Sequence, residues 1–330
     1  MEKQKVVVLG GGTGSNMTLK GLKLLRDLDL TAIITMSDDG GSTGKLRDEY
    51  GVLPSGDVRQ CLIALSDCSD TVRDLFSYRF DNGGLAGHNA GNILLTALEK
   101  ITGSFEEAIA TASQLLSVRG QVLPVTTSNV NVRIILNDGE VIDGEDTINN
   151  RHDISYIGVQ DLELFPKAVL NEKAKQAIVD ADMIIIGPGN IYGSILPNLM
   201  IPGMKEVLAS TKAKIVYNVN LMAKKEHCRK WSVEQFVLEI QKYIGDVIDI
   251  ALYNTTRPSQ ELLDKYHQEG SFVERQTTDE FIGKAHLIGV DLLADGIFIN
   301  PYKKDPIQRT LIRHDSLKVS QVIYKLLKSY

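Results

Sequence analysis

The chain has 330 residues, of which 43 % are hydrophobic and 24 % are charged, and its formal net charge is −6 at pH 7. This length and composition can support a sizeable core, and the acidic balance excludes the basic face that DNA or RNA binding needs. Three cysteines without a C-x-x-C spacing, no signal peptide and no apolar run of about 18 residues indicate a cytoplasmic protein without membrane insertion.

The first unit is expected to be a strand, a glycine turn and a helix. Residues 5–9 are mostly apolar, Gly10–Gly14 contains four glycines, and Ser15–Arg26 has leucines at helical spacing. The N-terminus of such a helix favours phosphate, because the helix dipole and the unpaired N–H groups both attract an anion. The dinucleotide fingerprint G-x-G-x-x-G is not met, since Ser15 stands where the third glycine belongs. A tight turn without a ligand is the alternative.

An acidic loop follows the second predicted strand, Thr31–Met36. The loop, Ser37–Arg47, combines two carboxylates, three glycines, hydroxyls and two cations. Its glycines allow the backbone to approach a ligand, and Asp38 and Asp39 could take a metal ion, a ribose or a proton. A solvated turn is the alternative for this loop.

Two further polar segments lie at predicted helix starts. Asp57 is expected to be the N-cap of the helix that carries Val58, and Arg59 could reach either a phosphate or solvent. The glycine-rich loop 81–87 leads into His88 and Asn89, whose side chains could hydrogen-bond a sugar, a phosphate or a catalytic water. Capping alone would also account for Asn89.

The middle of the chain changes its hydrophobic period. Val130, Val132, Ile134 and Leu136 alternate with polar residues, which predicts a hairpin in a smaller lobe at about residues 122–166. Residues 149–166 have no clear period and are not assigned.

A second parallel-sheet pattern begins at the strand Met183–Ile186. The loop Gly187–Ser194 follows it, and the strand Lys214–Val219 brings Asn218 and Asn220 to the same sheet edge. Open α/β sheets bind ligands at the carboxyl ends of their strands, so both glycine loops are expected to border one crevice. We therefore predict an α/β fold with a doubly wound, mostly parallel sheet. Helix caps are expected at Ser232, with Gln235, and at Asp315.

Five motifs together resemble the CofD-like family, and most closely its gluconeogenesis-factor branch. The similarity runs in order along nearly the whole chain to Arg313-His314-Asp315. The motifs are Gly10–Gly14, Ser37–Gly44, Leu53–Arg59, Gly87–Asn92 and Gly187–Tyr192.

This resemblance implies a single Rossmann-like domain over residues 1–330 with a smaller lobe, and a ligand of the nucleotide-diphosphate class. The branch is associated with UDP-sugars such as UDP-N-acetylglucosamine, with carbon metabolism and with cell shape. Ala223–His227 departs from the branch's more typical Thr-Gln-x-Gly-Glu, and Asn89, Asn190 and Gly193 replace commoner serine or threonine. The identity of the sugar stays open.

The leading hypothesis is a binding protein for a nucleotide sugar. Backbone donors of the glycine loops would hold the diphosphate, Lys45, Arg59 or Arg313 would neutralise it, and Tyr266 would stack on the base. The predicted ligand-binding residues are Gly11, Gly12, Thr13, Gly14, Asp38, Asp39, Gly40, Ser42, Lys45, Arg59, Asn89, Asn92, Gly187, Pro188, Gly189, Asn190, Asn218, Asn220, Tyr266 and Arg313.

The alternative is a CofD-type transferase. Asp39 and Asp57 would then hold Mg²⁺ against the diphosphate, and Asp38, Asp39 and His88 are the catalytic candidates, with Asp38 or His88 taking a proton from the acceptor hydroxyl. A third reading, an NAD(P) oxidoreductase, rests on the glycine turn alone. Homodimer formation and a regulatory protein partner stay open.

Overall fold

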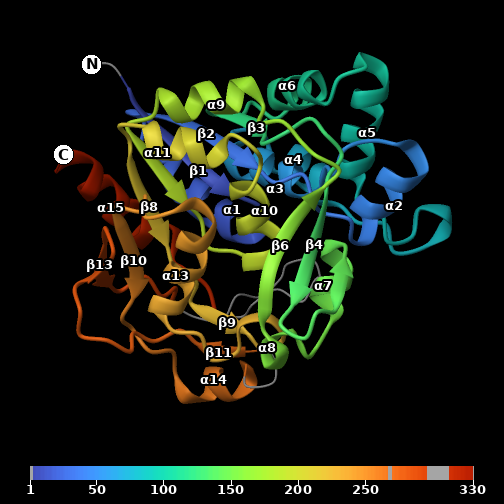
Figure 1. Cartoon of the computed structure of the whole chain (residues 1–330). Coiled ribbons are helices and arrows are strands. Elements are labelled where there is room, and N and C mark those ends of the chain that lie inside the picture. Colours follow the sequence, from blue (N-terminus) through green and yellow to red (C-terminus); the bar gives the residue numbers. More distant parts are fainter. Residues whose placement is uncertain (1–2, 267–269, 296–311, 330) are drawn as a thin grey trace.

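The computed structural model describes residues 3–266, 270–295 and 312–329. One sheet of eight strands runs through the molecule in the order β12-β13-β10-β8-β7-β1-β2-β3 (Figure 1). All its pairings are parallel except that of β12 with β13. The strands are β1 (Gln4–Gly10), β2 (Leu28–Ile34), β3 (Gln121–Pro124), β7 (Met183–Ile186), β8 (Lys214–Asn218), β10 (Ile250–Asn254), β12 (Phe281–Ile282) and β13 (Ala285–Val290).

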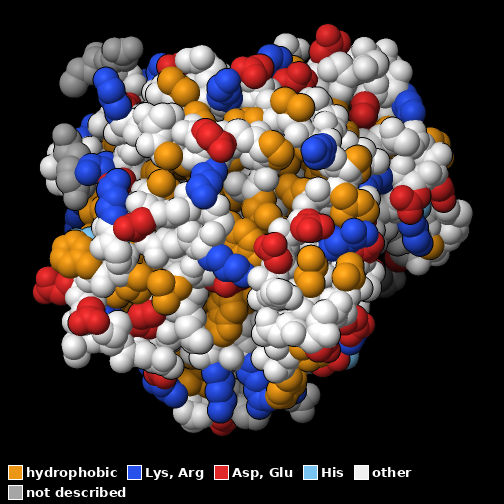
Figure 2. Space-filling model, viewed as in Figure 1, with side chains coloured by type: hydrophobic (Ala, Val, Ile, Leu, Met, Phe, Trp, Pro, Cys, Tyr) orange, Lys and Arg blue, Asp and Glu red, His pale blue; other side chains and the backbone are white. Residues whose placement is uncertain are grey.

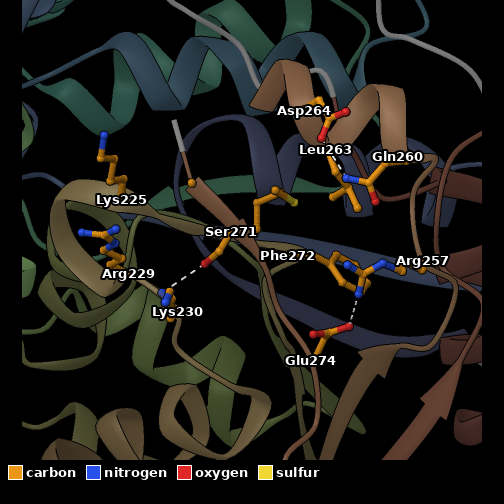
Figure 3. A pocket seen from close by; sticks show the side chains of 12 residues that line it. Lys225, Arg229, Lys230, Arg257, Gln260, Leu263, Asp264, Ser271, Phe272 and Glu274 are labelled. Carbon is orange, nitrogen blue, oxygen red and sulfur yellow. Dashed lines mark hydrogen bonds and ion pairs between the residues drawn. The ribbon is translucent and has the colours of Figure 1, made fainter. Parts of the chain in front are cut away.

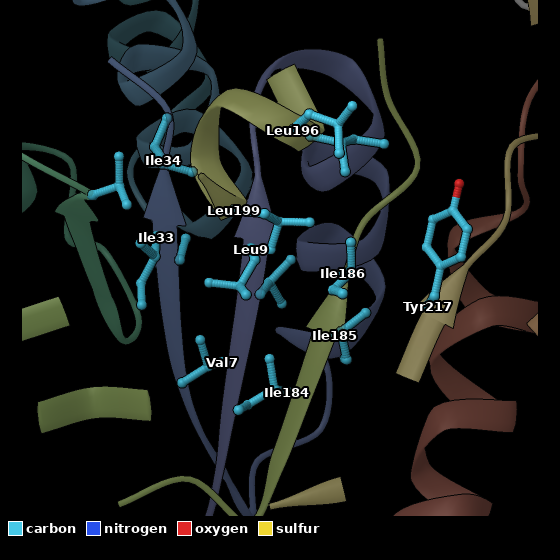
Figure 4. Close-up of a cluster of buried hydrophobic side chains, with 14 of the residues drawn as sticks. Val7, Leu9, Ile33, Ile34, Ile184, Ile185, Ile186, Leu196, Leu199 and Tyr217 are labelled. Carbon is cyan, nitrogen blue, oxygen red and sulfur yellow. The ribbon is translucent and has the colours of Figure 1, made fainter. Parts of the chain in front are cut away.

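The central strands are buried on both faces, as parallel strands covered by helices must be. Val7 and Leu9 of β1, Ile33 of β2 and Ile184 of β7 belong to one continuous hydrophobic core (Figure 4). Because these strands have unbroken apolar runs, the polar residues of this region lie at the strand ends. The carboxyl ends of β1, β2, β7 and β8 therefore carry the loops that the sequence singles out.

Helices cover both faces of the sheet. The chain moves from β1 to β2 in one direction and from β7 to β8 in the other, and right-handed crossovers put the connecting helices on opposite faces. One group is α1 (Gly12–Leu22), α3 (Gly56–Leu65), α4 (Asp70–Ser77), α5 (Ala90–Thr102), α6 (Phe105–Leu115) and α15 (Ser316–Lys328), and the other is α9 (Glu172–Val179), α10 (Leu196–Leu199), α11 (Met204–Ser210) and α13 (Val233–Ile244). This confirms the predicted doubly wound architecture.

A small antiparallel sheet, β5-β4-β6, forms the predicted smaller lobe. Its strand β4 alternates buried and half-buried residues, as its sequence period predicts. The unassigned segment after residue 149 forms the end of α7, then α8 and β6. Strand β3 pairs with β2 of the main sheet, so the small sheet itself begins only at Asn131. The lobe contains β4 (Asn131–Leu136), β5 (Val141–Asp143), α7 (Glu145–Asn150), α8 (Ile154–Ile157) and β6 (Val159–Phe165).

The remaining elements lie beyond the carboxyl ends of the strands. They are α2 (Gly41–Tyr50), the 3₁₀ turn η1 (Gly83–Leu85), the π-helical turn η2 (Ile191–Ile195), β9 (Met222–Lys224), α12 (Lys225–Cys228), α14 (Gln260–Tyr266) and β11 (Gly270–Phe272). Strands β9 and β11 pair antiparallel as a separate ribbon.

Several predicted helix caps are confirmed. Ser232 and Gln235 form a capping box on α13, and the Asp315 carboxylate accepts the N–H groups of Leu317 and Lys318 at the start of α15. None of the helices in the described part of the chain has the length and apolar character that crossing a lipid bilayer requires.

Candidate functional site

Two glycine loops contact each other where β1 and β7 end. A Cβ atom on Gly14 would lie 1.8 Å from the carbonyl oxygen of Pro188, so only glycine permits this approach. Ser15, which replaces the third glycine of the dinucleotide fingerprint, has its Oγ against Gly10 and Gly187. No described residue hydrogen-bonds that hydroxyl. The two predicted loops thus lie side by side, with a buried polar group between them.

Asp57 reaches the first glycine loop from α3. The predicted N-cap role is wrong, because α3 begins at Gly56 with Ser55 as its N-cap, and Asp57 lies inside the first turn. Its carboxylate accepts the N–H of Gly12 at the start of α1 instead. Burial, and then repulsion from Asp38, raise the pKa of Asp57 to about 7. A carboxyl with that pKa can give or take a proton near neutral pH.

Three carboxyl groups face one another here, those of Asp38, Asp57 and Glu145. Burial raises the pKa of Asp38, although hydrogen bonds from Gly40 and Thr43 oppose the shift. Burial and the neighbouring Asp38 charge raise the pKa of Glu145 well above its usual value. All three residues are partly exposed, so solvent reaches the cluster. Mutual repulsion favours retention of at least one proton by this group at neutral pH.

Asp39 joins the acidic loop to the small lobe. Its Oδ1 accepts the backbone N–H of Asp146, 2.7 Å away, in the first turn of α7. A carboxylate at a helix N-terminus satisfies unpaired donors and complements the helix dipole. Asp38 Oδ1 meanwhile accepts the N–H of Gly40 at 3.0 Å and fixes the turn between the two acids.

A polar network fills the space between α2, α3 and α5. Ser42 Oγ lies 3.3 Å from His88 Nδ1 and accepts the N–H of Asn89 at 3.1 Å. The Asn89 side chain caps α5, as predicted, by accepting the N–H of Asn92. Arg59 is 5 % exposed and donates to Asn92 Oδ1 at 2.8 Å. Of the two alternatives for Arg59, solvent is wrong, because its buried guanidinium ties α3 to α5.

The second glycine loop is held by Asn220. The Asn220 amide accepts the N–H of Gly189 at 3.1 Å and donates to the Gly189 carbonyl at 2.7 Å. This pair of bonds resembles a backbone ladder and fixes the loop. Asn218, the last residue of β8, is fully buried, and no described residue hydrogen-bonds to the nitrogen or the oxygen of its side-chain amide. Such a group needs a partner from a ligand or from water.

The small lobe closes the site through Glu145. Asn149 donates to the Glu145 carboxylate, and Asn190 of the second glycine loop donates to Asn149 Oδ1. A Cβ on Gly193 would lie 2.5 Å from Glu145 Oε1, so this glycine leaves room for the carboxylate. The lobe, the acidic loop and the second glycine loop thus meet at one place.

Other predicted residues lie outside this group or are covered. Lys45 is exposed on α2, whereas Arg313 is 7 % exposed beside the start of α15. Tyr266 is 2 % exposed and packs with Leu221 and Ile312 in a separate apolar cluster. A stacking role for Tyr266 would therefore require its ring to be uncovered.

Comparison with known proteins identifies the family of the chain. The family model described as 2-phospho-L-lactate transferase CofD matches residues 6–290. The chain belongs to the CofD family. A putative gluconeogenesis factor of Thermotoga maritima is 38 % identical over 323 residues, which cover 98 % of this chain and 99 % of that protein. The gluconeogenesis factor of Bacillus subtilis is 37 % identical over 332 residues, covering 99 % of both.

A solved structure has the same fold as this CofD-family chain. The crystal structure of a Bacillus halodurans protein superposes with a TM-score of 0.88 at 34 % identity, covering 98 % of this chain and 100 % of that one. A second crystal structure from that organism, described as a UPF0052 family member, gives 0.86. The predicted resemblance to the CofD-like family and its gluconeogenesis-factor branch is confirmed.

The carboxylates of the CofD-family site fit a metal only in part. Among the described residues, no group of three or more His, Cys, Asp or Glu side chains is arranged to hold a metal ion. The Asp39 carboxylate is hydrogen-bonded to α7. Asp57, which lies beside the first glycine loop, is therefore the better candidate for a metal ligand. Mg²⁺ commonly binds one or two carboxylates together with substrate phosphates, so the predicted Mg²⁺ would need the ligand's oxygens.

Sequence reasoning missed the contribution of the small lobe. Asn149 begins the unassigned stretch 149–166, Glu145 lies just before that stretch, and no motif marks either residue. The signal that could have found them is Gly144, a turn glycine with a φ of +91° directly before two acids at a helix start.

Proposed function

We propose that this CofD-family chain is a gluconeogenesis factor that binds a nucleotide sugar, with UDP-N-acetylglucosamine as the first candidate. The observation that carries the proposal is the contact between the two glycine loops at the carboxyl ends of β1 and β7. Ligands of open α/β sheets bind at this kind of edge. The names of the full-length relatives support the gluconeogenesis-factor part of the proposal.

The start of α1 supplies the diphosphate site in this proposal. Gly11, its N-cap, has no side chain to satisfy the helix donors, no acid lies in the first turn of α1, and Asp57 of α3 takes the N–H of Gly12. The dipole and the N–H groups there favour an anion. The Asn218 amide and the Ser15 hydroxyl provide buried polar atoms for the ligand or its ordered water.

The three carboxyl groups oppose the negative charge of a diphosphate. A proton held among Asp38, Asp57 and Glu145 lowers this repulsion, and Mg²⁺ brought in with the diphosphate would lower it further. The proposal thus predicts tighter binding with Mg²⁺ present, and tighter binding at pH 6 than at pH 8 in its absence.

Calorimetric titration tests the proposal. UDP-N-acetylglucosamine should bind, uridine should not, and Asn220→Ala should weaken binding by several-fold because the Gly189 loop loses the two hydrogen bonds that hold it. Lys100→Ala is the control, since Lys100 is exposed on α5 away from the loops, and should leave the affinity unchanged. The absence of any binding heat at millimolar UDP-N-acetylglucosamine, both with and without Mg²⁺, would contradict the proposal.

A CofD-type transferase is the second candidate, favoured by the raised pKa values of the carboxyl groups. Asp38 or Asp57 would take the proton of an acceptor hydroxyl as its oxygen bonds to a phosphorus of the diphosphate, and a nucleoside monophosphate would leave. Phosphorus NMR would follow that release. Asp38→Asn should then reduce turnover by about a hundredfold or more, whereas a pure binder would release no monophosphate in either form.

A further inference from the structure

A cavity of about 330 Å³ lies apart from the glycine loops, between the β9–β11 ribbon and α14. Lys225 lies in Ala223–His227, the segment where the sequence departs from the branch's typical pattern, and no other lining residue belongs to the motifs. Its volume falls at the lower end of the range of small-molecule sites, roughly 300–1,000 Å³. Met222 and Leu263 supply part of its apolar wall.

The cavity is rich in positive charge. Four of its lining residues are cations, namely Lys225, Arg229, Lys230 and Arg257, against two acids. Figure 3 shows the first three on one side of β11 and Arg257 on the other. Figure 2 shows Lys and Arg side chains gathered along the lower edge of the molecule, where Figure 1 has α14 and β11. On a chain of net charge −6, this is a local reversal of sign.

Among the described residues, three of the four cations have no carboxylate partner. Arg257 pairs with Glu274, and Arg229 donates to the hydroxyl of Tyr156. No described carboxylate pairs with the ammonium group of Lys225 or Lys230. Cations gathered in a concave surface raise the local concentration of anions.

The opposite wall offers an aromatic surface. The Phe272 ring lines the cavity, and the Arg257 guanidinium lies 6.0 Å from its centroid. A planar group entering the cavity could pack on Phe272 while its anionic end meets the lysines. The cavity therefore has on one side three cations that no described carboxylate pairs with, and on the other the Phe272 ring beside the Arg257–Glu274 ion pair.

We propose that this cavity is a second binding site, which takes a phosphorylated small molecule with a planar organic part. The phosphate lies between Lys225 and Lys230, and the planar part packs on Phe272. Phosphate suits the cationic side because it has several strong acceptor oxygens and up to two negative charges. No residue of the glycine loops takes part, so the site does not depend on the nucleotide-sugar proposal.

Calorimetry with AMP, adenosine and inorganic phosphate tests this site on the full chain. AMP should bind more tightly than inorganic phosphate, and adenosine should not bind. Lys225→Ala/Lys230→Ala should weaken AMP binding by about tenfold or more, because two charge-assisted contacts are lost. The same double variant should leave UDP-N-acetylglucosamine binding at the glycine loops unchanged, because neither lysine belongs to those loops.

Matched variants separate charge from structure. Lys225→Arg/Lys230→Arg keeps both charges and should bind AMP within about threefold of the natural chain. Lys100→Ala/Lys212→Ala removes two exposed lysines remote from the cavity and should change nothing. Equal AMP affinity in the natural chain and in the Lys225→Ala/Lys230→Ala variant would overturn the proposal. So would inorganic phosphate binding as tightly as AMP, or no AMP binding at millimolar concentration.

Discussion

The raised pKa of Asp57 makes the stability of the fold depend on pH. In the unfolded chain this carboxyl titrates near 3.8, whereas in the folded chain burial and Asp38 hold its pKa at about 7. Between these values the folded chain keeps a proton that the unfolded chain has released, so the free energy of unfolding falls as pH rises through this window. A carboxyl group with such a raised pKa lowers the free energy of unfolding at neutral pH. Residues that lower stability in this way are typical of functional sites.

The substitution Asp57→Asn removes this cost. At pH 8 the variant should have a free energy of unfolding about 1–3 kcal/mol higher than the natural chain, because the amide has no buried charge and can still accept the N–H of Gly12. The advantage should shrink toward pH 4. Urea denaturation at pH 5 and pH 8 measures it, and an advantage of the same size at both pH values would contradict the account.

At the scale of elements, the site depends on how closely α1 approaches the loop after β7. Gly14 and Pro188 belong to loops that are 174 residues apart in the chain, yet a single methyl group would not fit between them. This close approach lets both strand ends present backbone groups to one ligand.

Gly14→Ala tests that contact. The added Cβ would meet a backbone carbonyl, which cannot move without moving the loop, so the free energy of unfolding should fall by about 2–4 kcal/mol. Gly84→Ala is the matched control, because nothing lies within 4 Å of its Cβ position, and should shift the free energy by about 0.5 kcal/mol or less. Equal urea midpoints for the two variants would show that the loops do not contact.

The elements near the site could be predicted where the sequence pattern involves only neighbouring residues. The strand, glycine turn and helix of β1 and α1 follow from adjacent residues, and Asn89 and Asp315 cap helices that begin right after them. The partners of Asp57 and Arg59 could not be predicted. Helix rules describe contacts between neighbouring residues, whereas these two side chains contact residues far away in the sequence. Glu145 lies still further from any motif, because its role exists only once the lobe has folded back onto η2.

The whole molecule is a sheet with a small lobe resting on one end, and polar contacts from several segments of the chain join the two. Asp39 holds the first turn of α7, and Arg47 donates to Asn131 Oδ1 at the start of β4. Both residues come from the acidic loop and α2. The segment that contributes Asp38 to the site therefore also positions the lobe that contributes Glu145.

Asp39→Ala should loosen the lobe without unfolding the sheet. The N–H of Asp146 loses its acceptor, so amide hydrogen exchange should quicken by several-fold in α7 and stay unchanged in β1 and β7. Asp48→Ala, which removes an exposed acid of the adjacent helix α2, is the control. Unchanged exchange in α7 of the Asp39→Ala variant would show that Asp39 does not hold the lobe.

A crystal structure of the chain soaked with UDP-N-acetylglucosamine and Mg²⁺ tests the central claim most directly. The account predicts the diphosphate at the start of α1, against Gly11–Gly14, with the sugar or ribose near Asp38 and Asn190. Ligand bound only in the cavity of Lys225 and Lys230, or no ligand at either place, would contradict it.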